Sequence, residues 1–343
     1  MTTIPEADPG PTTAAATHVD PYARRLRASV LGLLVIIALV AGLISAVPGL
    51  DEISRPLSHA STAWLLVAIG LEYLSCTGYV LVILLAFPRG RSRPTARLAW
   101  AELAANAVLP AGGLGGLGLG AWVLTRKGVS SSRIAERSTV VFMLTTAASV
   151  LALVFVGLGL GTGLLHGPHA AALTLLPAAI GLAMFAAALA GARKAERIAA
   201  RIRRPRAAAA LTSLARGVQA TSVELRRGDW KLFGALGYFV FDVATLAATF
   251  AAIGLHPPIA AITMAHLVGQ LAGSIPIPGG LGVVDGGLVA ALVLYGIDLA
   301  PATAAVLLYR AIALGLPAIL GTIAFLVLRR SLDEPLVLRP GSE

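Results

Sequence analysis

The sequence of 343 residues is poor in charged residues and in cysteine. Asp, Glu, Lys and Arg make up 13% of it, about half the share in a soluble globular protein. The single cysteine, Cys76, excludes a disulfide framework or a thiolate metal site within one chain. His166 and His169 have no acid or thiol nearby to complete a metal site, and no Ser/His/Asp arrangement is found. We therefore expect no catalytic residue, no metal and no cofactor.

The sequence has instead many long apolar stretches, with 57% hydrophobic residues. A helix needs about 20 apolar residues to cross the hydrocarbon core of a bilayer. Uninterrupted candidates cover 28–48, 62–87, 138–165, 170–191, 231–254 and 301–328. Two further apolar regions, 98–125 and 259–296, are interrupted by Pro and Gly. This pattern predicts an all-α, polytopic membrane protein.

The basic residues fix the predicted orientation. Net charge is +10, but Lys and Arg lie between the apolar stretches, which favours cytoplasmic loops over nucleic-acid binding. All of the 27 Lys and Arg except Arg55 and Arg310 fall on one side if 98–125 and 259–296 each enter and leave the membrane on the same face. We predict six spanning helices and two re-entrant hairpins in the plasma membrane, with both termini cytoplasmic.

The predicted organisation is one transmembrane domain with short tails. Residues 1–22, rich in Pro, Thr and Ala, read as a disordered tail, 23–330 as the transmembrane domain and 331–343 as a short C-terminal tail. Within the domain, 193–230 is basic and has apolar positions at helical spacing, namely Leu211, Leu214, Val218 and Leu225. We expect either an amphipathic helix on the cytoplasmic leaflet or a solvated charged linker.

The two interrupted regions resemble each other. Both contain Gly-Gly-Leu-Gly after proline: Gly112, Gly113 and Gly115 follow Pro110, and Gly279, Gly280 and Gly282 follow Pro276 and Pro278. Each region stands between two spanning helices, and the two triplets have opposite predicted topology. This order predicts an inverted repeat of the kind found in transporters.

The breaks can serve binding or packing. A broken helix leaves free N–H groups and a positive dipole end near the midplane, and two such ends would suit an anion such as a phosphate. The same glycines would also allow helices to pack closely. The sequence leaves both interpretations open.

Ionisable residues inside membrane helices are functional candidates by default. Glu72, Glu102 and Asp242 either carry protons or ions, or tie helices together by hydrogen bonds. We expect Asp285 and Arg310 to form a pair, which is either structural or part of a substrate site. Their polar companions within the membrane are Asn106, His266, Gln270 and Tyr309.

Four segments resemble a known family. Asn106-Ala-Val-Leu-Pro-Ala-Gly-Gly, Leu124-Thr-Arg-Lys-Gly-Val, Ile275-Pro-Ile-Pro-Gly-Gly-Leu-Gly-Val-Val-Asp and Leu308-Tyr-Arg are similar to the flippase-like membrane domain, the transmembrane region of lysylphosphatidylglycerol synthases and their stand-alone relatives. The resemblance spans about 28–330 and implies a lipid translocator. Few residues follow Arg330, so we expect no synthase domain and no enzymatic activity. Relatives often carry Glu where this chain has Asp285.

From residues and resemblance together, we expect binding or translocation of an anionic phospholipid or a polyprenyl-phosphate-linked head group. The alternative is a membrane-embedded transferase or an accessory protein in lipid-linked glycan or aminoacyl-lipid metabolism. Expected protein partners are a second copy of the chain or a separate synthase. The expected substrate-binding residues are Asn106, Pro110, Gly112, Gly113, Gly115, Pro276, Pro278, Gly279, Gly280, Gly282, Asp285, Tyr309 and Arg310.

Overall fold

The chain folds into helices wherever the structure describes it. The computed structural model describes residues 57–87, 92–108, 114–167, 170–199, 201, 205–273 and 281–330, with the backbone alone at 114, 196, 205–206, 271–273 and 281–285. Its helices are α3 (Thr62–Ala86), α4 (Ser92–Val108), α5 (Leu114–Arg126), α6 (Ser131–Gly161), α7 (Ala171–Ala199), α8 (Pro205–Arg227), the short 3-10 helix η1 (Trp230–Leu232), α9 (Phe233–Ala252), α10 (Ile259–Gly273), α11 (Leu281–Leu294) and α12 (Leu299–Arg330). These described residues contain no strand.

Five helical segments are long and apolar enough to cross a membrane. They are Thr62–Ala86, Ser131–Gly161, Ala171–Ala195, Trp230–Ala252 and Leu299–Arg330, and they match five of the six predicted spans. The sixth, 28–48, lies outside the described residues. Large apolar side chains on these helices point outward, among them Phe155, which is 71% exposed, and Leu66, which is 64% exposed. The all-α membrane class predicted from the sequence is confirmed.

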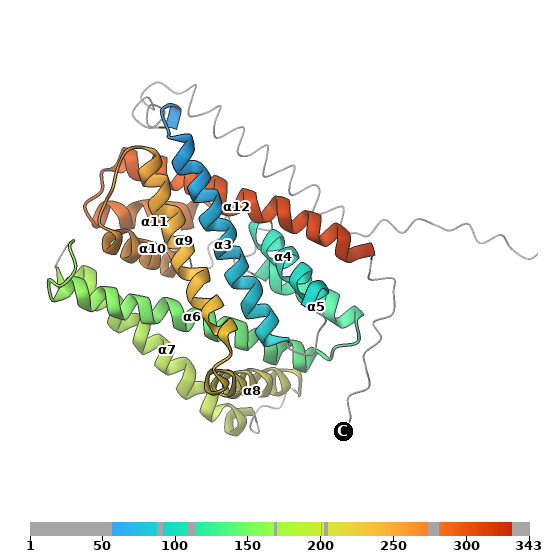
Figure 1. The fold of residues 1–343 in the computed structure, drawn as a ribbon. Coiled ribbons are helices and arrows are strands. Elements are labelled where there is room, and N and C mark those ends of the chain that lie inside the picture. Colours follow the sequence, from blue (N-terminus) through green and yellow to red (C-terminus); the bar gives the residue numbers. More distant parts are fainter. Residues whose placement is uncertain are drawn as a thin grey trace, which may run out of the picture.

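Helices α3 and α9 pack side by side in the middle of the molecule (Figure 1). Two glycines make this close approach possible. A Cβ atom at Gly78 would lie 2.5 Å from the backbone nitrogen of Tyr238, and one at Gly234 would lie 2.7 Å from the carbonyl oxygen of Gly78. Any larger residue would push the two helices apart. This crossing joins the two halves of the chain.

Each interrupted apolar region forms two short helices that pack on each other, α4 with α5 and α10 with α11. Gly116, near the start of α5, meets Asn106, near the end of α4, while Gly120, one turn later, meets Glu102, one turn earlier. The two helices are therefore antiparallel. With 13 to 17 residues each, the four helices are about 20–25 Å long, short of the hydrocarbon thickness of about 30 Å.

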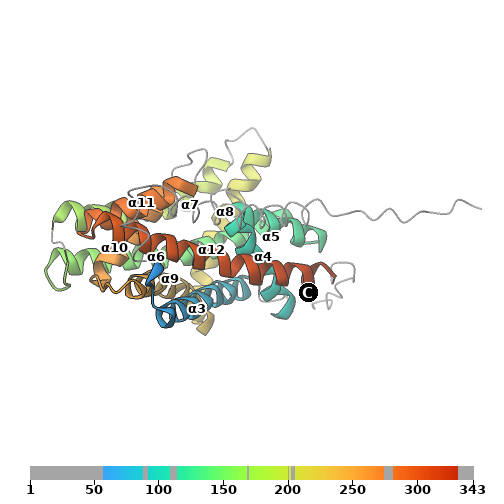
Figure 2. The same ribbon diagram turned by 90° about the horizontal axis from the view of Figure 1, so that it is seen from above.

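The neighbour relations repeat between the halves. Helices α3 and α9 each contact α6 and α12, while α4 packs on α12 and α10 packs on α6. The α4–α5 and α10–α11 pairs lie toward opposite ends of α12 (Figures 1 and 2). Exchanging α3, α4, α5 and α6 for α9, α10, α11 and α12 preserves these contacts, which is the pattern that an inverted repeat requires.

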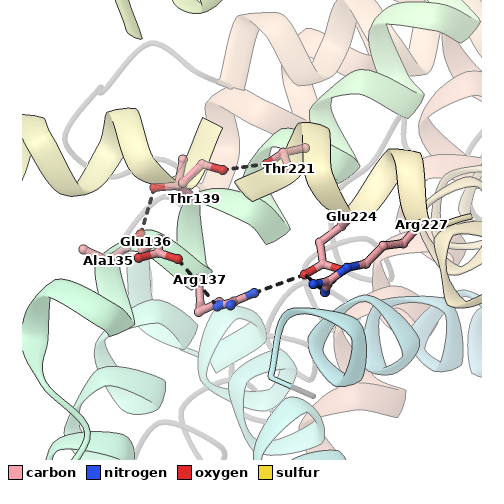
Figure 3. Close-up of polar contacts among 8 residues, drawn as sticks. Ala135, Glu136, Arg137, Thr139, Thr221, Glu224 and Arg227 are labelled. Carbon is pink, nitrogen blue, oxygen red and sulfur yellow. Dashed lines mark hydrogen bonds and ion pairs between the residues drawn. The ribbon is translucent and has the colours of Figure 1, made fainter. Parts of the chain in front are cut away.

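Helices α7 and α8 connect the halves, and α8 packs on α6. The buried positions of α8 are small or polar, namely Ser213, Ala215, Gly217, Thr221 and Glu224. The Glu224 carboxylate lies 3.3 Å from Arg137 of α6 and 3.2 Å from Arg227 (Figure 3). Leu214 and Leu225 of the predicted amphipathic segment stay exposed. Of the predicted apolar positions, Leu214 and Leu225 thus face outward and Leu211 and Val218 are half-buried, while the small and polar residues make the contact with α6.

The connection from α8 to α9 is a capped turn. The Asp229 carboxylate accepts a hydrogen bond from Lys231 Nζ at 2.8 Å and another from the Lys231 backbone N–H at 3.0 Å. These two bonds hold the pKa of Asp229 below its usual range. Trp230 and Phe233 beside this turn are 63% and 73% exposed. Exposed aromatic residues at a helix end are typical of a membrane–water interface.

Candidate functional site

Three of the predicted intramembrane charges lie well inside their helices, about ten residues or more from the helix ends. Glu72 lies about ten residues from the start of α3, Asp242 about ten from the end of α9, and Arg310 about eleven from the start of α12. At 1.5 Å per residue each lies about 15 Å from its helix end, or half the thickness of a hydrocarbon core. These charges therefore belong near the midplane.

A polar cluster joins α9, α10 and α12 at that depth. The Tyr309 hydroxyl donates a hydrogen bond to Asp242 Oδ1 at 2.6 Å, and His266 Nε2 lies 3.1 Å from Asp242 Oδ2. Gln270 Nε2 lies 2.7 Å from the same His266 nitrogen. The ring of Tyr309 packs edge-on against His266, with centroids 6.0 Å apart. We call Asp242, His266, Gln270, Tyr309 and Arg310 the midplane cluster.

The midplane cluster is enclosed but not sealed. The His266 side chain is 4% exposed, whereas that of Asp242 is 17% exposed. His266 Nδ1 is buried and has no hydrogen-bond partner among the described residues. A buried polar atom without a partner is costly, so it indicates a strained structure or a place for a ligand.

Helix α3 brings further charge to the midplane cluster. Glu72 is buried, accepts a weak hydrogen bond from Cys76 Sγ at 3.4 Å, and lies close enough to Asp242 for their charges to interact. Arg310 also interacts electrostatically with Asp242. The structure thus brings the paired acids of α3 and α9 together with the arginine of α12.

A second polar cluster lies within the first half of the chain. The Tyr79 hydroxyl of α3 donates to Glu102 Oε2 of α4 at 3.1 Å, and Gly120 of α5 packs directly against the other carboxylate oxygen. Asn106 Oδ1 accepts a hydrogen bond from the backbone N–H of Gly116 at 2.7 Å. We call Tyr79, Glu102, Asn106, Gly116 and Gly120 the hairpin cluster. Its contacts close α4, α5 and α3 onto one another.

An apolar groove of about 610 Å³ runs between α6 and α9. Leu225 and Leu232 line one end, Ile259 and Thr263 the other, and Phe155 borders it on α6. Its α9 wall, from Leu232 to Ala244, is about 18 Å long, close to the thickness of one leaflet. The groove therefore has the length and chemistry to hold an acyl chain.

The groove and the midplane cluster share a wall. Phe239 and Val243 line the groove and flank Asp242 on α9. The Phe239 ring also meets His266 edge-on at 6.4 Å between centroids. The Phe239 ring thus lies between the apolar groove and His266 of the polar cluster.

A larger cavity of about 720 Å³ lies between α11 and α12. Its lining residues are apolar except for Thr303, and no charged residue is among them. An apolar hollow of this kind holds lipid tails or another helix equally well. The smaller groove is the better candidate because it adjoins charged groups.

The structure locates only part of the predicted substrate-binding set. Tyr309 lies in the midplane cluster with its hydroxyl on Asp242, and Arg310 lies beside it. Asn106 and Gly115 lie in the α4–α5 pair, where Asn106 serves as the acceptor for Gly116. Pro110, Gly112, Gly113, Pro276, Pro278, Gly279 and Gly280 lie outside the described residues, and for Gly282 and Asp285 only the helical backbone is described.

Sequence reasoning did not single out Tyr79 or Phe239. Tyr79 follows Glu72 by seven residues, two helical turns, so helical spacing alone places both on one face of α3. Phe239 carries no comparable signal, because an apolar residue in an apolar helix looks the same whether it faces lipid, core or a site.

The fold and these clusters define a multi-pass helical membrane protein with charged side chains near its midplane. A family model described as the lysylphosphatidylglycerol synthase TM region matches residues 29–321, most of the chain. The chain belongs to this family. No curated protein matches the chain.

Proposed function

We propose that this protein binds an anionic lipid or a lipid-linked head group and moves it between leaflets. The observation that carries the proposal is the position of Phe239, which lines the α6–α9 groove and also meets His266 of the midplane cluster edge-on. A lipid needs a polar site for its head group beside an apolar site for its chains. Arg310 and His266 supply the cationic or donor groups that a phosphate oxygen would contact.

The proposal assigns no catalytic step to the acids. A general base must reach the proton that it abstracts. In the transferase alternative, Asp285 or Glu102 would act as the base. Glu102 is 5% exposed, bonded to Tyr79 and covered by Gly120. The cavity beside this carboxylate has a volume of about 10 Å³, which is too small for a lipid-linked substrate. A transport role does not require a substrate to reach this carboxylate.

The proposed transport cycle uses the two short-helix pairs as re-entrant hairpins in the plasma membrane, with both termini cytoplasmic. Their helix lengths and their positions at opposite ends of α12 support this assignment. Ser130 tests it, because it is exposed and its side chain makes no capping bond. In a Cys76→Ser background, Ser130→Cys should be labelled only from the cytoplasm. Labelling from outside would contradict the topology.

The function is tested by filling the groove. Ala244→Trp places a large ring in the groove, whereas Leu182→Trp adds one on the outward face of α7, where Leu182 is 51% exposed. In liposomes with a fluorescent anionic lipid and a neutral analogue, Ala244→Trp should slow movement of the anionic lipid at least about tenfold. Leu182→Trp should not change it. Equal handling of both lipids by the wild-type protein would contradict the proposal.

A further inference from the structure

We infer that the midplane cluster binds a proton together with the anionic head group, and that His266 is the residue that joins the two. This inference rests on the proposed function and names the ion that would be coupled to it. It starts from the two short contacts of His266 Nε2, 3.1 Å to Asp242 Oδ2 and 2.7 Å to Gln270 Nε2.

These contacts allow two forms of the neutral His266 ring, which differ in the nitrogen that carries the proton. If Nε2 carries the proton, it donates to the Asp242 carboxylate, and Gln270 must turn its amide oxygen toward the ring. If Nε2 is bare, the ring proton lies on Nδ1, and the one lone pair of Nε2 accepts a hydrogen bond from either Gln270 or a protonated Asp242. The first form leaves Asp242 ionised and Nδ1 open to a second proton.

The free nitrogen of His266 links that proton to a ligand. Neutral His266 that donates to Asp242 through Nε2 leaves Nδ1 as a bare acceptor in a buried site. A second proton, on Nδ1, creates an imidazolium that still faces Asp242 and also presents an N–H to an incoming oxygen. An anionic oxygen stabilises that N–H by a charge-assisted hydrogen bond. The anion and the proton therefore favour each other's binding.

The surrounding charges act in the same direction. Helix α3 faces Asp242 with Glu72 and Cys76, α12 with Tyr309 and Arg310, and α10 with His266. Tyr238 on α9 itself is the further titratable neighbour. When Glu72 is protonated, the charges of Asp242 and Arg310 offset each other, and a second proton on His266 gives the cluster a net positive charge. That charge attracts an entering anion.

The site lies where its occupation can move a helix. Helix α10 ends at Gly273, before the second Gly-Gly-Leu-Gly string, and its His266 contacts Asp242 of α9 and meets the Tyr309 ring of α12 edge-on. Protonation and anion binding change these contacts. Binding of a proton and an anion at His266 and Asp242 can therefore couple a proton gradient to movement of α10 and α11.

The test measures proton uptake on binding of a defined lipid. The purified full chain in detergent is titrated calorimetrically with dihexanoyl phosphatidylglycerol, an anionic probe, and with dihexanoyl phosphatidylcholine, a neutral one. Titration in two buffers of different ionisation enthalpy gives the protons taken up. For the anionic probe we expect uptake of up to about one proton per bound lipid. The Kd should therefore rise by up to about tenfold for each unit by which the pH is raised.

Two variants and a matched control assign the proton. His266→Asn keeps an N–H donor near the Nδ1 position but cannot titrate, so uptake should vanish and Kd should lose its pH dependence. Asp242→Asn removes the carboxylate that holds the imidazolium and should lower uptake as well. His256→Asn changes an exposed histidine beside Trp64 and should behave as wild type.

The outcomes separate this inference from the proposed function. Anionic lipid binding without proton uptake in the wild-type chain, or uptake in His266→Asn equal to wild type, would overturn proton coupling and leave lipid binding standing. No binding of the anionic probe at any pH would overturn the proposed function itself. If His266→Asn fails to fold, wild-type uptake with the anionic lipid alone, together with Asp242→Asn, decides the question.

Discussion

The hairpin cluster and the midplane cluster occupy comparable places in the two halves but are built differently. In the hairpin cluster, Tyr79 and Gly120 enclose Glu102, and Asn106 satisfies a backbone N–H. In the midplane cluster, Asp242 is partly exposed and His266 keeps a nitrogen without a partner among the described residues.

The difference teaches that the two halves share helix order and neighbours without sharing polar chemistry. Closed hydrogen bonds in the first half fix α4, α5 and α3 together. The open, titratable cluster of the second half adjoins the groove through Phe239. We therefore expect substitutions in the hairpin cluster to act on stability and those in the midplane cluster to act on lipid handling.

The largest expected effect concerns the partner of Arg310. Arg310→Ala should lower the free energy of unfolding by about 3 kcal/mol, because it leaves a buried carboxylate without a compensating positive charge. If Asp242 is its main partner, Arg310→Ala combined with Asp242→Ala should cost less than the sum of the single changes by about 1–3 kcal/mol. Thermal unfolding in detergent measures these differences. If the coupling is found with Asp285 instead, which is the pair expected from the sequence, then the carboxylate that balances Arg310 lies on α11 and not in the midplane cluster.

Glycine packing gives the next largest effect. Gly120→Val should destabilise the protein by about 2–3 kcal/mol, because its new carbons occupy the place of the Glu102 carboxylate. Gly286→Val in α11, the matching helix of the second half, is the control, since a Cβ there meets nothing within 4 Å. Equal losses for the two variants would remove the distinction between a closed and an open pair of short helices.

Two tyrosine substitutions test whether the hairpin cluster acts on stability and the midplane cluster on lipid transport. Tyr79→Phe should cost about 2 kcal/mol of stability, because Glu102 loses its hydrogen bond, with little change in transport rate per folded molecule. Tyr309→Phe should cost about 1 kcal/mol, since Asp242 keeps His266, but should slow anionic lipid movement several-fold. Flux assays normalised to folded protein check both. If Tyr79→Phe slowed transport and Tyr309→Phe affected only stability, the hairpin cluster and not the midplane cluster would handle the lipid.

The smallest effect is expected outside both clusters. Arg227 is 62% exposed, and Glu224 keeps Arg137 when Arg227 is removed. Arg227→Ala should therefore change stability by less than about 1 kcal/mol and leave flux unaltered. A large loss of flux would show that the contact between α8 and α6 takes part in transport.

The sequence by itself determined the membrane class, five of the spans and the identity of the buried polar residues. Apolar length and the placement of charge carry that information, because lipid tolerates few charges and demands complete helices. His266, Gln270, Tyr309 and Asp242 could each be recognised as polar residues at depth, and the family could be recognised from its motifs.

Only the tertiary structure decided which of those residues meet. Asp242 and Tyr309 are 67 positions apart in the chain, and their hydrogen bond exists because α9 and α12 pack together. The outward positions of Leu214 and Leu225 on α8 and the contact between Phe239 and His266 likewise depend on helix rotation. Hydropathy cannot fix that rotation in a membrane protein, because lipid and protein interior are both apolar. Side-chain packing and buried hydrogen bonds fix it instead.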